Sequence, residues 1–188
     1  MRWRDDGLGV EVELAASNSP AAVDDLSPGE RSRLPDGPRR DDWLRGRAAL
    51  KALVDGGDTA TVAFPHRGLS LTHSAGVAVA ARCDGDQDGL GVDFEGWRPI
   101  DARAARFYLH DDEWHDDERG DLLRLWTVKE AVFKATPANG TAVLLDYRVA
   151  DPGALAGEAT DRGGRRFRYV SRRRPDGWLT IAVCGAAV

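Results

Sequence analysis

The chain has 188 residues, 42% of them hydrophobic and 30% charged, which suits one large domain or two small lobes that share a core. No apolar run is long enough to cross a membrane, and the start of the chain lacks the charged and apolar regions of a signal peptide. The formal net charge of −5 argues against a general nucleic-acid binder, although it allows a local basic pocket. Cys83 and Cys184 lack metal-ligand spacing, so we expect reduced, buried thiols in a cytoplasmic protein.

The first quarter of the chain predicts one strand and two helices. Residues 7–15 (GLGVEVELA) alternate apolar and polar side chains, which is typical of a strand. In LSPGERSRL, Ser27 as N-cap and Pro28 at the first helical position predict a helix start. Residues 39–57 predict a longer helix that a Gly-Gly pair ends. Its apolar stripe is formed by Trp43, Leu44, Ala48, Leu50 and Leu53.

Between residues 59 and 95 the apolar period changes to two, which indicates strands. Residues 59–64 (TATVAF) predict a short strand, and longer strands follow over residues 69–84 and 89–95. The sequence GDQDG between the two longer strands has the glycine and aspartate content of a hairpin loop.

After Pro99 the helical period returns, and the last part of the chain again predicts strands. Amphipathic helices are predicted over residues 100–109 and 121–136. The three predicted C-terminal strands are LLDYRVA, RRFRYVSRR and WLTIAVCG. This order of elements favours an α+β fold with two lobes that meet near residue 91.

The stretch GVDFE places two carboxylates on one face of a strand. Asp93 and Glu95 project together, and Val92 and Phe94 project to the opposite face, where they would anchor the strand in a core. Like charges held so close repel each other, and a hard divalent cation removes the conflict. The alternative is an ordinary solvated strand face.

The stretch LWTVKEAVFKA adds a third carboxylate and a cation. Trp126, Glu130 and Lys134 follow one another at i, i+4 and i+8 along one helix face. A tryptophan on that face implies partial burial, so these residues suit a metal–diphosphate site. The alternative is an exposed ion pair between Glu130 and Lys134, worth a few tenths of a kcal/mol.

The stretch LSLTHS places His73 between Thr72 and Ser74 at a strand start. Near a phosphate, an imidazolium flanked by hydroxyl donors could bind the anion. The alternative is a structural histidine whose hydrogen bonds are satisfied within the fold.

In chain order, SLTHSAGVAVA, GVDFE and LWTVKEAVFKA resemble the three signatures of the 4′-phosphopantetheinyl transferases, and the single-chain, two-lobed type is the nearer match. The resemblance is strong from about Ser70 to Ala135 and looser outside these residues. It implies two similar α/β lobes related by a pseudo-twofold axis, with the active site in the cleft between them. Residues 1–90 would hold the adenine and 3′-phosphate side of coenzyme A, and residues 91–188 the metal and catalytic motifs.

The resemblance also implies the reaction and its partners. Such enzymes move the 4′-phosphopantetheine arm of coenzyme A to a serine of an acyl, peptidyl or aryl carrier protein and release 3′,5′-ADP. We expect a monomeric, Mg²⁺-dependent enzyme of polyketide or nonribosomal peptide biosynthesis, or of fatty-acid synthesis, that binds its carrier transiently and binds neither nucleic acid nor membrane. A docking surface for the carrier is predicted over residues 100–109, where Arg103 and Arg106 supply positive charge and Phe107 an apolar contact.

Residue roles follow from the same resemblance. The metal ligands would be Asp93, Glu95 and Glu130, and Glu130 would also be the base, directly or through a metal-bound water. Lys134 would neutralise diphosphate charge, and His73 with Thr72 would bind the 3′-phosphate end of coenzyme A. The family usually has serine where this chain has Thr72, so a methyl group crowds that position. Further 3′-phosphate contacts are expected from the first lobe, with Arg31, Arg33, Arg39, Arg40 and Arg47 as candidates.

Two rival classes share these features: a non-catalytic descendant that binds coenzyme A or carriers, and a Mg²⁺-dependent enzyme acting on another diphosphate. Two other motifs have separate interpretations. HDDEWHDDE (residues 110–118) is a metal cluster or an exposed acidic turn, and SRRRP (residues 171–175) is a basic patch or a solvated hairpin end.

Overall fold

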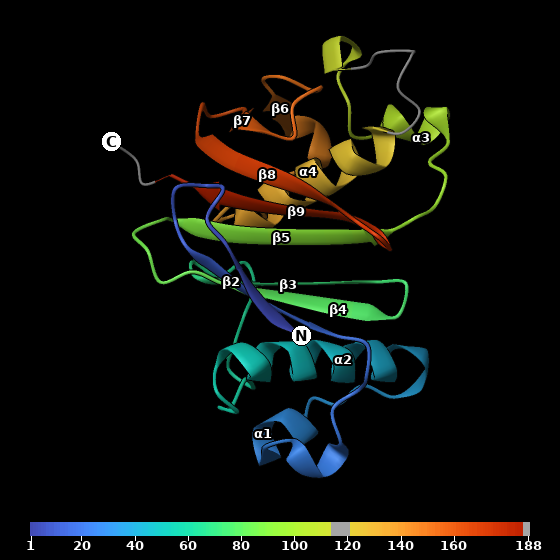
Figure 1. Cartoon of the computed structure of the whole chain (residues 1–188), viewed down its shortest axis with the longest axis vertical. Coiled ribbons are helices and arrows are strands. Elements are labelled where there is room, and N and C mark those ends of the chain that lie inside the picture. Colours follow the sequence, from blue (N-terminus) through green and yellow to red (C-terminus); the bar gives the residue numbers. More distant parts are fainter. Residues whose placement is uncertain (114–120, 186–188) are drawn as a thin grey trace.

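The computed structural model describes residues 1–113 and 121–185, which form two antiparallel sheets with helices on their outer faces (Figure 1). The first sheet has the order β1-β2-β4-β3, with β1 Arg2–Asp5, β2 Val12–Ser17, β3 Leu69–Ser74 and β4 Val77–Arg82. The second has the order β5-β9-β8-β7-β6, with β5 Gly89–Gly96, β6 Tyr147–Val149, β7 Ala156–Asp161, β8 Arg166–Arg174 and β9 Gly177–Cys184. The helices are α1 Pro28–Arg31, α2 Arg40–Leu53, α3 Ala102–Ala105 and α4 Asp121–Ala135. The expected α+β class is therefore confirmed.

The elements stack as four layers, helix, sheet, sheet and helix (Figure 1). Helix α2 packs on the outer face of the first sheet through Leu50 and Leu53. The main core lies between the two sheets, and α4 covers the outer face of the second sheet through Val128 and Val132. None of the described helices is long and apolar enough to span a bilayer.

Strand β5 shows the predicted alternation of faces. Val92 and Phe94 are buried in the core between the sheets, as are their neighbours on β9. Asp93 and Glu95 therefore turn toward the α4 side. This confirms the sequence-based assignment of the two faces, but Asp93 is almost fully buried, which rules out the solvated strand face.

The start of α1 forms as predicted. The Ser27 hydroxyl accepts a hydrogen bond from the Glu30 amide at 3.1 Å, and a Glu30 carboxylate oxygen accepts one from the Ser27 amide at 2.8 Å. This capping box satisfies two amides at the start of the helix, with Pro28 in its first turn. The longer helix predicted over residues 39–57 is α2.

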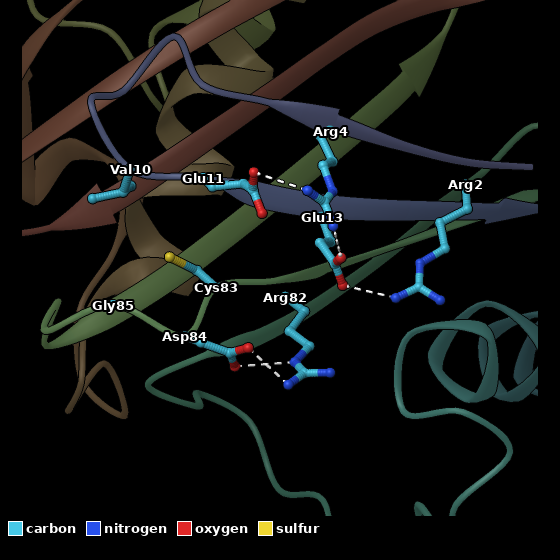
Figure 2. Close-up of a pocket in the computed structure, with 9 residues that line it drawn as sticks. All are labelled: Arg2, Arg4, Val10, Glu11, Glu13, Arg82, Cys83, Asp84 and Gly85. Atoms are coloured by element: carbon cyan, nitrogen blue, oxygen red, sulfur yellow. Dashed lines mark hydrogen bonds and ion pairs between the residues drawn. The ribbon is translucent and has the colours of Figure 1, made fainter.

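Strand β1 was missed, because its residues Arg2 and Arg4 give no apolar signal. It is stabilised instead by ion pairs across to β2, where Glu13 pairs with both arginines and Glu11 with Arg4 (Figure 2). These side chains line a pocket of about 470 Å³ and are paired with one another. The predicted strand over residues 7–15 begins only at Val12, after a turn.

Three further predictions of secondary structure were wrong. Residues 59–64 form turns rather than a strand, because the amides of Thr59 and Ala60 bind the carboxylates of Glu30 and Asp58. GDQDG does not close a hairpin, since β4 pairs with β2 and β3 while β5 pairs with β9. Turn chemistry predicts a change of direction but does not name the partner strand. The helix predicted over residues 100–109 shrinks to the single turn of α3, and β7 was not foreseen.

Candidate active site

Asp93 is the most constrained carboxylate of the site. Its Oδ1 atom accepts hydrogen bonds from the Thr72 hydroxyl at 2.9 Å and from the Lys134 ammonium at 2.7 Å. Its Oδ2 atom is buried and has no hydrogen-bond partner among the residues that the structure describes. Burial raises the pKa of Asp93, while Lys134 and Thr72 oppose that rise. A buried carboxylate oxygen without a partner is costly, so this atom indicates a missing cation or donor.

Glu95 lies two residues further along β5, at the more open end of the site. Its Oε2 atom accepts a hydrogen bond from the Ser74 hydroxyl at 2.8 Å and lies 3.3 Å from Nε of Arg98. The arginine that follows the acids in the sequence thus pairs with the second of them. Glu95 is half-buried, so one side of its carboxylate stays open to a ligand.

Glu130 reaches the site from α4, which lies unusually close to β5. A Cβ on Gly89 or Gly91 would overlap the carbonyl oxygens of Ala135 and Ala131, so only glycines allow this approach. Burial raises the pKa of Glu130, and the negative charges of Asp93 and Glu95 raise it further. The three carboxylates therefore act on one another electrostatically.

The alternative interpretation, an exposed ion pair between Glu130 and Lys134, is not what the structure shows. Lys134 turns instead to Asp93, because a buried carboxylate on the neighbouring strand is a better partner than a half-buried one on its own helix. Trp126 is half-buried as expected and packs edge-on against Tyr108, with ring centroids 5.1 Å apart. The helix predicted to carry these residues forms, but the Lys134 ammonium neutralises Asp93 on β5 and not Glu130.

The donor set suits Mg²⁺, although the described residues contain no group of three or more His, Cys, Asp or Glu side chains arranged to hold a metal by themselves. Mg²⁺ is usually held by one or two carboxylates together with substrate phosphates and water. The partnerless Oδ2 of Asp93 and the half-buried Glu95 meet that requirement. Asp93, Glu95 and Glu130 are therefore the residues that could hold the ion.

A cavity of about 370 Å³ is reached from the site through Lys134, which binds Asp93, although none of the three carboxylates lines it. Lys134 and Phe133 line it from α4, and His73 lines it from β3, together with Phe64 and Asn139 from the intervening loops. His73 itself is exposed, whereas the neighbouring Thr72 is buried and its hydroxyl is engaged by Asp93. His73, which the sequence assigned to the 3′-phosphate end of coenzyme A, and Lys134, which it assigned to the diphosphate, thus line one cavity.

Of the five candidate arginines in the first part of the chain, Arg33 and Arg47 have similar contacts and Arg40 differs from them. Arg33 and Arg47 both bind the segment of residues 59–60, where Arg47 donates to the carbonyl and hydroxyl of Thr59 at 3.0 Å. Burial lowers the pKa of Arg47, and the nearby charge of Arg33 adds to that effect. Nε of Arg47 is buried without a partner among the described residues. Arg40 makes no ion pair within the described part of the chain, and none of the three lines the cavity.

Sequence reasoning missed a second ion pair on α4. Lys129 is fully buried, and its ammonium binds both carboxylate oxygens of Glu113 at 2.8 and 2.7 Å and the carbonyl of Tyr147. Glu113 also accepts the amides of His110 and Val149. The only local signal was a lysine at an otherwise apolar helix position.

The two remaining motifs have different outcomes. HDDEWHDDE extends beyond Glu113 into residues 114–118, which lie outside the described residues. SRRRP ends β8 at its turn into β9, as the hairpin interpretation predicts. Its arginines are engaged, since Arg172 pairs with Asp5 at 2.8 Å and Arg173 stacks on Trp97.

Comparison with known proteins gives the class of this site. Residues 89–174 match the model of the 4′-phosphopantetheinyl transferase superfamily, a range that contains the three carboxylates and Lys134 but neither His73 nor the arginines of the first half. This part of the chain is therefore similar to that superfamily.

Among curated proteins, the chain is similar to the 4′-phosphopantetheinyl transferases AcpT of Escherichia coli strain K12 and of Escherichia coli O157:H7. Each is 34% identical over 127 residues, which cover 58% of this chain and 64% of the relative. The matched part thus spans slightly less than two thirds of the length of these relatives.

Proposed function

We propose that the protein transfers the 4′-phosphopantetheine arm of coenzyme A to a serine of an apo carrier protein and releases 3′,5′-ADP, with Mg²⁺ as cofactor. The observation that carries this proposal is the partnerless Oδ2 atom of Asp93, whose Oδ1 atom binds Lys134, a residue that lines a cavity together with His73. A dinucleotide-like diphosphate needs a cation at its centre and further positive groups along its length. The match of residues 89–174 to the superfamily model narrows that chemistry to phosphopantetheinyl transfer.

Asp93, Glu95 and Glu130 would hold the metal. When bound, Mg²⁺ supplies charge neutralisation and Lewis acidity at the diphosphate. Lys134 would bind the same diphosphate from the cavity side, where it is partly exposed and already oriented by Asp93. Transfer of this kind depends on in-line positioning and charge stabilisation more than on covalent work by the protein.

Glu130 would take the proton of the acceptor serine, directly or through a water. Burial and the neighbouring carboxylates raise its pKa, and a base works best when its pKa lies closer to the working pH. On α4, Glu130 faces the carboxylates of β5, whereas the apolar residues of α4 pack into the core of the second sheet. The hydroxyl of an incoming serine could therefore reach it without unfolding the helix.

The 3′-phosphate end of coenzyme A would be bound by His73, Arg33 and Arg47. Two like charges placed close together, one with a buried partnerless Nε, are stabilised by an anion between them. Arg40 is kept as a further candidate, since it makes no ion pair in the described structure. The Thr72 hydroxyl already contacts Asp93, so any contact of this side chain with phosphate would use its remaining surface.

The two-lobed organisation is part of the same proposal. The sheets divide the chain between β4 and β5, a few residues before the proposed boundary between lobes of residues 1–90 and 91–188, which supports two lobes with the substrate between them. His73 of the first sheet and Lys134 of the second unit line one cavity, which supports a cleft between similar lobes. A cytoplasmic monomer remains our expectation.

The carrier would dock over residues 100–109, which begin a few residues after Glu95. Phe107 is 78% exposed, so it is not a core residue, and Arg103 and Arg106 make no ion pair with described residues. For Arg103→Glu we expect the KM for the carrier to rise about tenfold, the KM for coenzyme A to stay unchanged, and the salt dependence of transfer to weaken. Unchanged kinetics for both substrates would place the docking surface elsewhere.

The test of the function is the mass of an apo carrier protein incubated with coenzyme A and Mg²⁺. Addition of one phosphopantetheine group is expected with the wild-type protein and not with Asp93→Ala, whose circular dichroism should match the wild type. Binding of coenzyme A without a mass change would identify a non-catalytic binder. Release of a different product from another diphosphate would identify the second rival class.

A further inference from the structure

Strands β3 and β5 lie side by side at the junction of the two sheets, yet they form no backbone ladder (Figure 1). They are joined instead by hydroxyl groups, which we call the hydroxyl seam: Ser70, Thr72 and Ser74. Each accepts a hydrogen bond from a β5 amide 22 residues later, namely Val92 at 2.9 Å, Phe94 at 3.4 Å and Gly96 at 3.3 Å. The constant separation shows that the two strands run in the same direction.

The seam uses one face of β3, and the other face lines the cavity. Side chains alternate along a strand, so Ser70, Thr72 and Ser74 turn toward β5. Leu71 and His73 line the cavity described above, and Ser70 of the seam borders it as well. The amides on this edge of β5 would otherwise be buried without acceptors, and the hydroxyls satisfy them. One short strand therefore serves both the junction and the substrate side.

Two of the three hydroxyls also donate a hydrogen bond through their single proton. Thr72 donates to Asp93 at 2.9 Å and Ser74 donates to Glu95 at 2.8 Å, whereas Ser70 donates to no carboxylate in the described part of the chain. A hydroxyl that accepts from an amide and donates to a carboxylate is held at two points. The first sheet thus fixes the orientation of both carboxylates on β5.

We propose that Thr72 and Ser74 are positioning residues that hold Asp93 and Glu95 ready for the divalent cation. With Thr72 and Lys134 on Oδ1, the Oδ2 atom of Asp93 stays free, and with Ser74 on Oε2, the second oxygen of Glu95 stays free. Groups that orient metal ligands typically account for about 10- to 100-fold in metal affinity. This inference rests on the proposed function, because it assumes that the carboxylates bind a metal.

The test measures Mn²⁺ binding by electron paramagnetic resonance, without and with coenzyme A, in Thr72→Val and Ser74→Ala. Each variant is expected to raise the dissociation constant for Mn²⁺ about 10- to 100-fold. Thr72→Ser restores the hydroxyl and should restore the affinity. Ser70→Ala is the matched control and is measured without coenzyme A, because Ser70 also borders the cavity. It breaks the same seam without touching a carboxylate, and its dissociation constant should stay within about twofold of the wild type. Unfolding by urea, followed in all four variants, separates loss of fold from loss of metal binding.

The inference is overturned if Thr72→Val and Ser74→Ala bind Mn²⁺ as the wild type does, or if Ser70→Ala weakens binding equally. It is also overturned if the wild type binds no Mn²⁺ even with coenzyme A. A wild-type protein that binds Mn²⁺ but leaves an apo carrier unmodified would refute the proposed function alone, and the variants would still decide the inference. Active wild type with unchanged variant affinities would refute the inference alone.

Discussion

Helix α4 carries two lysines, each paired with a carboxylate, in opposite surroundings. Near the helix middle, Lys129 and Glu113 are both fully buried, and the carboxylate is satisfied by the lysine and two amides. At the helix end, Lys134 is partly exposed at a cavity, and its partner Asp93 keeps one oxygen without a hydrogen bond among the described residues. The first pair closes a network, and the second leaves room for a ligand.

The comparison shows that pairing alone does not separate structural from functional charges. Both lysines bind a carboxylate at 2.7 Å, so distance gives no distinction. What differs is the number of carboxylate oxygens left over and the presence of a cavity. A satisfied pair is expected to control stability, and an unsatisfied one to control activity. The predictions below test this distinction.

The largest effect is expected for Lys129→Met. The substitution leaves Glu113 buried without its cation, which typically costs about 3–5 kcal/mol of unfolding free energy. Urea denaturation measures the loss. Adding Glu113→Gln should recover part of it, because glutamine removes the buried charge and its one carbonyl oxygen still accepts one of the two amides of His110 and Val149. A loss below about 1 kcal/mol would show that the pair does not hold the fold.

Glu30 provides a second satisfied carboxylate, in the first half of the chain. Burial raises its pKa, but hydrogen bonds from Thr59 and Ser27 and the Lys51 ammonium outweigh that effect and hold the pKa at about 2, below the ordinary 4.5. Because the folded pKa is depressed, the stabilisation is complete above pH 4.5 and is lost as the pH falls toward 2.

The shift corresponds to roughly 3 kcal/mol. Urea unfolding of the wild type between pH 5 and 2 should therefore lose up to about this amount relative to Glu30→Gln, whose stability should vary less over the same range. Parallel pH profiles for the two proteins would mean that Glu30 titrates normally.

Lys134→Met should affect activity more than stability. Transfer is expected to fall on the order of 100-fold, because a preorganised positive group at the diphosphate is lost. The unfolding free energy should fall less than for Lys129→Met, since the raised pKa of Asp93 allows its carboxylate to take up a proton. Steady-state kinetics and urea denaturation give the two numbers. A stability loss as large as that of Lys129→Met, with transfer intact, would erase the distinction between the pairs.

The smallest effect is expected for His73→Ala, which removes a second residue that lines the cavity with Lys134. Loss of a phosphate contact remote from the reacting atoms should lower kcat/KM for coenzyme A about tenfold, or about 1.4 kcal/mol. The measurement compares coenzyme A with 3′-dephospho-coenzyme A. The wild type should prefer coenzyme A more strongly than the variant does, and an equal preference would remove His73 from the 3′-phosphate site.

Local periodicity predicted the parts of the site that depend on one element. The alternation of GVDFE assigned Asp93 and Val92 to opposite faces, and the spacing of LWTVKEAVFKA placed Glu130 and Lys134 on one helix. Contacts between distant elements could not be obtained this way. Lys134 prefers Asp93, 41 residues away, to its own helix neighbour, and Lys129 finds Glu113 across an intervening segment. No local sequence pattern predicts these ion pairs, because the burial of the two partners in the folded chain determines which groups pair.

The hydroxyl seam shows the same limit for the fold. The alternating hydroxyls of LSLTHS were visible in the sequence, but nothing in them named β5 as the neighbour. The hairpin prediction instead joined β4 directly to β5, because consecutive strands with a turn between them usually pair. The segment between β4 and β5 instead passes from the first sheet to the second. This brings β5 beside β3, where the hydroxyl contacts form.

The glycines of β5 have a consequence for the dimensions of the site. At Gly89 and Gly91 the strand touches the carbonyl oxygens of α4 with no side chain between them. The distance between the strand that bears Asp93 and the helix that bears Glu130 is therefore set by direct contact between the two main chains. Changes of rotamer or core repacking elsewhere cannot adjust it. A single methyl group at Gly91 would push the two backbones apart and widen the space between the carboxylates that are proposed to share one small ion.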